Sequence, residues 1–324
     1  MSVIAVAGGT GKLGRAIVEA LNATGKFTVF ILGREVCQCF PSTESFTCHL
    51  IRMCRSELGA KILAVNYDDV PSITATLEKS NIDTVISAVT SVSTFDPELA
   101  LIAASDKSSV TKRFIPSIWG VPYSEEIAAL FPPAENKIKA TNALEATSLD
   151  WTSVYNGYFL DYFGIPKVKS YMDPISLAVD VANDFAAIPG SGNVPITFTH
   201  TFDIAKYVAA YVQKATWEKE VYIIGDKVTW NEFVALAEDA RGKKFTVVYD
   251  PLEKLAKGEI TELPSHTHLY PFFPKPMLQG LFAAFGTFIE NGVFDFKVAH
   301  TLNQEFPEIK ARTVKEVLDA AWKQ

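Results

Sequence analysis

Short apolar runs alternate with amphipathic stretches along the first half of the chain. Residues 3–7 form a continuous apolar run, which is typical of a strand buried on both faces. Residues 12–24 carry apolar side chains at the spacing of one helical face, namely Leu13, Ile17, Val18 and Leu21. Gly25 follows this stretch, as glycine commonly does where a helix ends.

The alternation continues to about residue 157. Further strands are predicted at residues 27–32, 61–65, 84–89, 113–116 and 152–155, and further helices at residues 73–79, 97–105 and 137–148. Strands that alternate with helices favour right-handed crossovers and a parallel sheet with helices on both faces. The pattern therefore predicts an α/β fold with a Rossmann-like, doubly wound parallel sheet.

The rhythm changes after residue 157, where proline and glycine become frequent. We therefore divide the chain into an NAD(P)-binding Rossmann domain, residues 1–157 with contributions from later segments, and a smaller substrate-binding portion, residues 158–324. Residues 269–296 are rich in aromatic side chains. Three interpretations stay open for them: a lid over an aromatic substrate, ordinary core, or the face of a homodimer.

Composition excludes several classes of protein. The 324 residues are 48% hydrophobic, which is enough to bury a sizeable core and excludes disorder as the main state. A net charge of −7 argues against a nucleic-acid partner. The apolar stretch at residues 277–289 is shorter than the roughly 20 residues that a bilayer requires, and no basic segment precedes residues 3–7. We therefore expect no membrane partner, a cytoplasmic location and reduced cysteines.

A glycine-rich turn lies directly between the first predicted strand and the first helix. It reads G-x-x-G-x-x-G and consists of Gly8, Gly9, Thr10, Gly11, Lys12, Leu13 and Gly14. Glycine permits positive φ and lets a pyrophosphate approach the backbone, while the helix N-terminus offers free N–H groups and partial positive charge. The alternative is a tight strand–helix turn without a ligand. No Gly-Lys-Ser/Thr closes the turn, which excludes a P-loop.

The end of the second predicted strand favours NADP(H) over NAD(H). Arg34 follows this strand, where its guanidinium can pair with a 2′-phosphate. Glu35 competes as an acceptor for the ribose hydroxyls, and a solvated loop charge is the alternative for Arg34. Lys12 adds positive charge near the phosphates. Ala88 and Val89, at the end of the fourth strand, are expected to line the nicotinamide side.

Several segments, taken in order, resemble the NmrA-like and isoflavone reductase-like branch of the atypical short-chain dehydrogenases/reductases. They are the glycine turn, Arg34, residues 113–120, residues 137–152, residues 200–205, and residues 225–226 with 229–232. The resemblance implies NADP(H) as cofactor and a small aromatic or conjugated substrate. It also implies that Lys137 is the catalytic acid/base beside the nicotinamide. Thr141 stands where the family often has arginine.

The residues themselves support Lys137 in part. An ammonium group in an apolar cleft has a lowered pKa and becomes a usable proton donor, although a lysine at a helix start is usually a solvated charge. Lys139 is expected to face away from Lys137. No tyrosine has a lysine four residues later, so tyrosine-based ketone reduction is not supported. Tyr123, Asn156 and Tyr158 are the candidate substrate contacts.

The four cysteines fall within residues 37–54, with a spacing that matches no common zinc site. We expect a surface insertion there, and no metal. The chain is therefore expected to be an NADPH-dependent oxidoreductase. Two alternatives stay open: a non-catalytic NADP(H)-sensing regulator that binds a partner protein, and a quinone or aldehyde reductase in detoxification.

Overall fold

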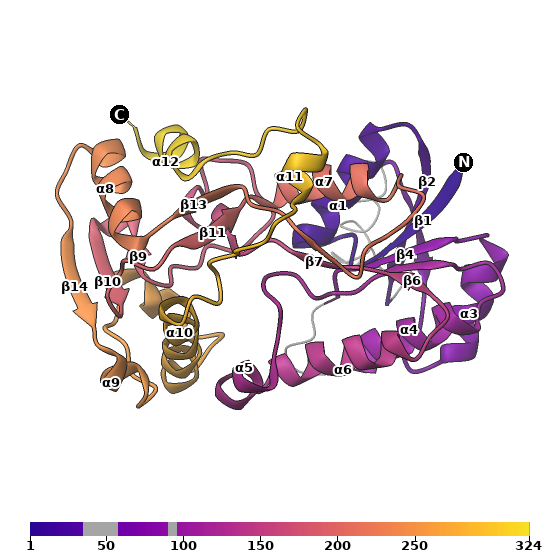
Figure 1. Ribbon diagram of the computed structural model, residues 1–324, viewed down its shortest axis with the longest axis horizontal. Coiled ribbons are helices and arrows are strands. Elements are labelled where there is room, and N and C mark those ends of the chain that lie inside the picture. The colour runs from indigo at the N-terminus through magenta and orange to yellow at the C-terminus, as the bar shows by residue number, and fades with distance from the viewer. Residues whose placement is uncertain (35–57, 90–95, 324) are drawn as a thin grey trace, which may run out of the picture. The chain divides into compact units, whose positions relative to one another are not determined.

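The computed structural model describes residues 1–34, 58–89 and 96–323 (Figure 1). The four cysteines and Glu35 lie outside these ranges. Two compact units divide the chain, and the chain passes between them several times. The first unit comprises Met1–Trp119, Pro133–Val154 and Ile204–Val221, and the second comprises Gly120–Pro132, Tyr155–Asp203 and Tyr222–Gln324.

A parallel sheet of six strands forms the centre of the first unit. Its order is β3-β2-β1-β4-β5-β6, and the bounds are β1 Ser2–Ala7, β2 Phe27–Gly33, β3 Lys61–Ala64, β4 Thr84–Ser87, β5 Arg113–Ile115 and β6 Asp150–Trp151. Residues Ile4 to Ala7 of β1 are buried, as expected for a strand covered on both faces. The predicted doubly wound α/β fold is confirmed. Its strand order reverses at β1, where such folds bind their ligands.

Helices cover both faces of this sheet (Figure 1). The amphipathic helix α1, Lys12–Ala23, buries the predicted stripe, since Ile17, Val18 and Leu21 are fully enclosed. Figure 1 shows α1 and α7 along one face, and α3, α4 and α6 along the other. The bounds of these further helices are α3 Val70–Lys79, α4 Asp96–Lys107, α6 Ala134–Glu145 and α7 Thr201–Tyr211.

The sixth strand differs from the prediction of residues 152–155. Strand β6 ends at Trp151, and the N–H of Thr152 still donates to Phe114 O at 3.2 Å. The next N–H, that of Ser153, instead donates to Lys219 O at 2.9 Å. Residues Ser153–Tyr155 therefore form a separate strand, β7, which pairs with β12, Glu220–Tyr222.

The second unit contains two sheets of three strands, ordered β14-β10-β9 and β13-β11-β8. Their bounds are β8 Tyr158–Phe159, β9 Val179–Asp180, β10 Phe185–Pro189, β11 Ile196–Thr199, β13 Asp226–Val228 and β14 Thr246–Asp250. The longer helices are α8 Trp230–Arg241, α10 Lys275–Glu290 and α12 Val314–Trp322, and the shorter ones are α5 Glu125–Leu130, α9 Leu252–Leu255 and α11 Leu302–Glu305. A capping box at Thr229 begins α8, and Gly242 in the left-handed region ends it.

The aromatic stretch at residues 269–296 lies mainly inside the second unit. Phe282 and Phe288 of α10 are buried, as are Phe294 and Phe296 after it. The core interpretation is therefore confirmed for these four side chains. Phe272, by contrast, is 84% exposed.

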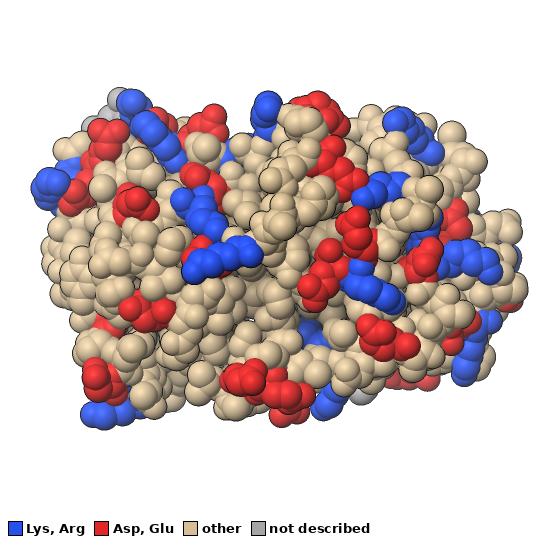
Figure 2. Space-filling view, viewed as in Figure 1, with Lys and Arg blue, Asp and Glu red and all other residues tan. Residues whose placement is uncertain are grey.

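The described helices include none with the length and hydropathy that crossing a bilayer requires. On the face drawn in Figure 2, basic and acidic side chains are interspersed.

Candidate cofactor and catalytic site

The glycine turn joins the end of β1 to the start of α1. Gly8 has φ +75°, and a Cβ built on it would lie 2.6 Å from Ala88 O at the end of β4. A Cβ on Gly14 would collide with Gly8 O, so Gly14 allows the helix to pack against the turn. The fold itself therefore requires glycine at positions 8 and 14.

Gly11 is different, because the fold does not require glycine there. Its φ of −121° suits any residue, and the nearest atom to a built Cβ is Gly8 O at 4.0 Å. The residue also precedes the first turn of α1, which contains no acidic side chain to offset the positive end of the helix dipole. The open space beside Gly11 leaves room for a ligand to approach this backbone closely. A pyrophosphate is the anion that such a turn accommodates.

Thr10 and Lys12 lie at the exposed tip of this turn, whereas Leu13 is buried beneath it. Lys12 has φ 37°, in the left-handed region that is uncommon outside glycine. The turn thus presents backbone and a cationic side chain on its outer surface, while Leu13 anchors it to the core.

Arg34 lies exposed just beyond β2, and Tyr67 lies within its electrostatic reach on the segment after β3. Burial and the negative charge of Glu98 together raise the pKa of Tyr67 to about 12, although the positive charge of Arg34 opposes the rise. Arg34 and Tyr67 follow adjacent parallel strands, so both belong to the carboxyl edge of the sheet. Sequence reasoning identified Arg34 but missed Tyr67, whose only signal was its place just after the third strand.

The end of β4 completes the edge beside the glycine turn. The N–H of Ala88 donates to Ala7 O at 2.9 Å, and Val89 O accepts from Ser117 Oγ, also at 2.9 Å. The structure thus brings Ala88 next to Gly8 and Val89 next to the segment after β5. Ser91, Ser93 and Thr94, which continue this segment, lie outside the described residues.

Lys137 lies in the first half of α6, and its Nζ donates to Ser117 O, on the segment after β5. Burial lowers the pKa of Lys137, and the negative charge of Glu98 partly opposes that change. A half-buried ammonium with a lowered pKa is a usable proton donor. Lys139 is exposed and pairs with Glu135 at 3.6 Å, so it faces away from Lys137 as predicted.

Glu98, near the start of α4, is a further candidate for the site that the sequence alone did not single out. Its carboxylate accepts from Ser87 Oγ at 2.5 Å and from the N–H of Ser117 at 2.9 Å. The side chain is buried, at 2% exposure. Burial raises the pKa of Glu98, while the two hydrogen bonds and Lys137 oppose the rise.

The three candidate substrate residues belong to the second unit. Burial raises the pKa of Tyr123 to about 12. Asn156 is fully buried, and its amide accepts from Gly120 N at 3.1 Å and donates to Gly157 O at 3.0 Å. Tyr158 is buried among aromatic rings, which include Phe198 and Trp230. The substrate role of all three stays a prediction.

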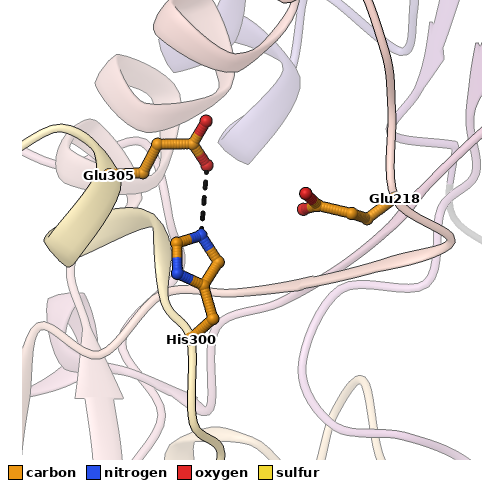
Figure 3. A group of neighbouring side chains, drawn as sticks. All are labelled: Glu218, His300 and Glu305. Carbon is orange, nitrogen blue, oxygen red and sulfur yellow. Dashed lines mark hydrogen bonds and ion pairs between the residues drawn. The ribbon is translucent and has the colours of Figure 1, made fainter.

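His300 and Glu305 form a polar pair in the second unit. Glu305 is the last residue of α11, and His300 directly precedes Thr301, the N-cap of that helix. Figure 3 shows His300 facing Glu305, with His300 Nε2 at 3.4 Å from the carboxylate. His300 is exposed, and the third side chain drawn, Glu218, belongs to the first unit.

The profile of the NmrA-like family matches residues 1–318. The oxidoreductase BOA1 of Botryotinia fuckeliana is 32% identical over 311 residues, which cover 94% of this chain and 95% of that protein. The phenylcoumaran benzylic ether reductase TP7 of Nicotiana tabacum is 29% identical over 98% of this chain and 97% of its own length.

Solved structures share the fold. The binary complex of leucoanthocyanidin reductase with NADPH from Vitis vinifera superposes with a TM-score of 0.75, covers 98% of both chains and is 22% identical. The resemblance inferred from the sequence segments is confirmed by the family match.

Proposed function

The chain belongs to the NmrA-like family, and from this premise we propose that it is an NADPH-dependent oxidoreductase that reduces a small aromatic or conjugated organic substrate. The observation that carries the proposal is the pairing of Gly11 with Lys137 in one unit. Gly11 leaves room for a ligand that the fold itself does not require, and Lys137 is a half-buried lysine with a lowered pKa. A dinucleotide site and a proton donor are the two parts that a reductase needs.

The residues that would hold the cofactor lie along the carboxyl edge of the six-stranded sheet. The backbone from Gly8 to Gly14 and the N-terminus of α1 fit the pyrophosphate. Arg34 supplies a guanidinium for a 2′-phosphate, and Ala88 and Val89 follow the neighbouring strand. These residues match NADP(H) better than NAD(H), because Arg34 carries a positive charge where NAD(H) enzymes usually place an acid.

When bound, NADPH supplies the hydride that reduces the substrate. The protein's part is to orient the reactants and to deliver a proton. Lys137 holds that proton on Nζ, and Ser117 O fixes the direction of the ammonium. Because burial lowers the pKa of Lys137, the proton leaves more readily than from an exposed lysine.

Relatives support the substrate class. They include proteins named as an oxidoreductase, a phenylcoumaran benzylic ether reductase and an isoflavone reductase-like protein. A reductase of quinones or aldehydes would use the same site and differ only in the substrate it accepts. The cytoplasmic location, the homodimer and the division of the substrate portion at residue 158 stay predictions from the sequence.

A binding titration with NADPH, followed by absorbance assays on quinones, enones and aryl ketones, tests the proposal. We expect turnover on an aromatic enone or ketone, lost in Lys137→Ala while NADPH binding is kept. Lys139→Ala is the matched control, because Lys139 is exposed two residues away on the same helix. Tight NADPH binding with no turnover across the panel would instead favour the non-catalytic regulator.

A further inference from the structure

Glu98 is a carboxylate in a buried position, where packing alone would favour an uncharged side chain. It lies near the start of α4 at 2% exposure, and an ionised carboxylate in such a position is unfavourable unless hydrogen bonds and charge compensate it. An uncharged amide would fill almost the same volume. A carboxylate that is buried and held by two hydrogen bonds therefore points to a task for its charge.

The carboxylate of Glu98 contacts two segments beside Lys137. One oxygen accepts from Ser87 Oγ at the end of β4, and the other accepts from the N–H of Ser117 after β5. The carbonyl of the same residue, Ser117, receives the ammonium of Lys137. The indole of Trp119 closes the group by donating to Ser87 O at 3.1 Å. Glu98 thus links the end of β4 to the Ser117 segment, whose carbonyl orients Lys137.

We propose that Glu98 is a positioning residue for Lys137: it fixes the Ser117 segment against which the ammonium lies, and its negative charge keeps that ammonium protonated until the proton is delivered. This inference rests on the proposed reductase function. Glu98 acts through Lys137 and Ser117, so its role is distinct from that of the proton donor itself.

Other charged groups nearby do not replace Glu98. On α6, Glu135 and Lys139 pair with each other at an exposed position. On α4, Asp106 at the far end of the helix accepts from Ser148. Tyr67, on the segment after β3, is close enough to Glu98 to have its pKa raised by that charge. The charge of Glu98, by contrast, acts directly on the pKa of Lys137.

Glu98→Gln separates the charge from the shape. The amide oxygen can still accept from the N–H of Ser117, and the Ser87 hydroxyl can rotate to accept from the amide nitrogen. A structural role would therefore survive in this variant, while the charge beside Lys137 would be lost. A neighbouring opposite charge raises the pKa of a lysine, so its removal lowers the pKa of Lys137 further.

Two readouts follow Lys137 in the full-length protein. The first is the pH profile of kcat, whose alkaline limb marks the loss of the proton from Lys137, and we expect Glu98→Gln to move it about one pH unit lower. The second is the NMR titration of lysine Cε in protein grown on labelled lysine, with the Lys137 signal assigned by Lys137→Arg. This readout needs no turnover, and we expect the same downward shift.

Glu135→Gln is the matched control, because it removes an exposed carboxylate on the helix that carries Lys137, and both readouts should stay in place. An unchanged Lys137 titration in folded Glu98→Gln would overturn the inference. If the Lys137 titration shifts in Glu98→Gln but the unaltered protein shows no turnover, the charge effect of Glu98 on Lys137 stands and the reductase function is refuted.

Discussion

Two of the four glycines in the turn, Gly8 and Gly11, are expected to respond differently to replacement by alanine. In Gly8→Ala the new methyl group must occupy a backbone at φ +75° and approach Ala88 O to 2.6 Å. The left-handed conformation alone costs an L-residue roughly 1–2 kcal/mol, and the backbone contact adds to this. We expect Gly8→Ala to lower the free energy of unfolding by about 2 kcal/mol or more.

Gly11→Ala should leave stability nearly unchanged. Its φ is −121° and its Cβ meets open space, with Gly8 O at 4.0 Å as the nearest atom. Alanine is a weaker N-cap than glycine by several tenths of a kcal/mol, while the loss of freedom in the unfolded chain stabilises by about 0.4–1 kcal/mol. The two effects nearly cancel, so the change should stay within about 0.5 kcal/mol.

Although Gly11→Ala should keep its stability, we expect it to bind NADPH more weakly. The methyl group occupies the space through which a phosphate would reach the backbone N–H groups. Losing one hydrogen bond to a charged group removes about 1.5–3 kcal/mol, which weakens NADPH about tenfold to a hundredfold.

Urea denaturation and a fluorescence titration with NADPH measure the two quantities on the same samples. If Gly11→Ala binds NADPH as tightly as the unaltered protein, the open space beside Gly11 serves no phosphate, and the assignment of the turn is refuted. If Gly11→Ala unfolds as readily as Gly8→Ala, the packing reasoning is wrong.

Three further predictions concern the cofactor, the proton and the fold. Arg34→Ala should weaken NADPH about tenfold or more and leave NADH nearly unaffected, because only NADPH carries the 2′-phosphate that a guanidinium binds; competitive titrations measure this, and equal weakening of both would refute the assignment. Turnover should decline as pH rises, starting below the pH at which an exposed lysine loses its proton, because burial lowers the pKa of Lys137; a kcat profile flat through that range would contradict the role of Lys137. Thr229→Ala removes the capping box of α8 and should lower the free energy of unfolding by about 1 kcal/mol without changing the affinity for NADPH, as denaturation and titration will test.

The first half of the fold was largely predictable because its signals are local. The apolar run of β1, the stripe of α1 and the glycine turn each occupy fewer than about 15 residues and need no distant partner to be recognised. Backbone propensity and burial agree in these segments, so periodicity alone identified them.

Features that depend on distant partners were missed. Strand β6 stops at Trp151 because the next ladder partner of Ser153 is Lys219, 66 positions further along the chain (219 minus 153). The short helix α5 begins at a Ser124 cap that periodicity over six residues cannot reveal. Glu98 was overlooked for a similar reason, because a glutamate near the start of a helix usually faces solvent. Only its partners on β4 and after β5 show that it is buried.

The distribution of each unit over three stretches of chain limits how the molecule can be dissected. Residues 204–221 join the nucleotide-binding half late in the sequence, tied by Lys26 Nζ to Gln213 at 2.6 Å and by Arg113 to Lys214 O at 3.0 Å. A gene fragment that stops before residue 204 would therefore lack one helix and leave apolar surface uncovered. A single protease cut cannot release either unit intact, and biosynthesis must reach residue 221 of 324 before the first unit has all its segments.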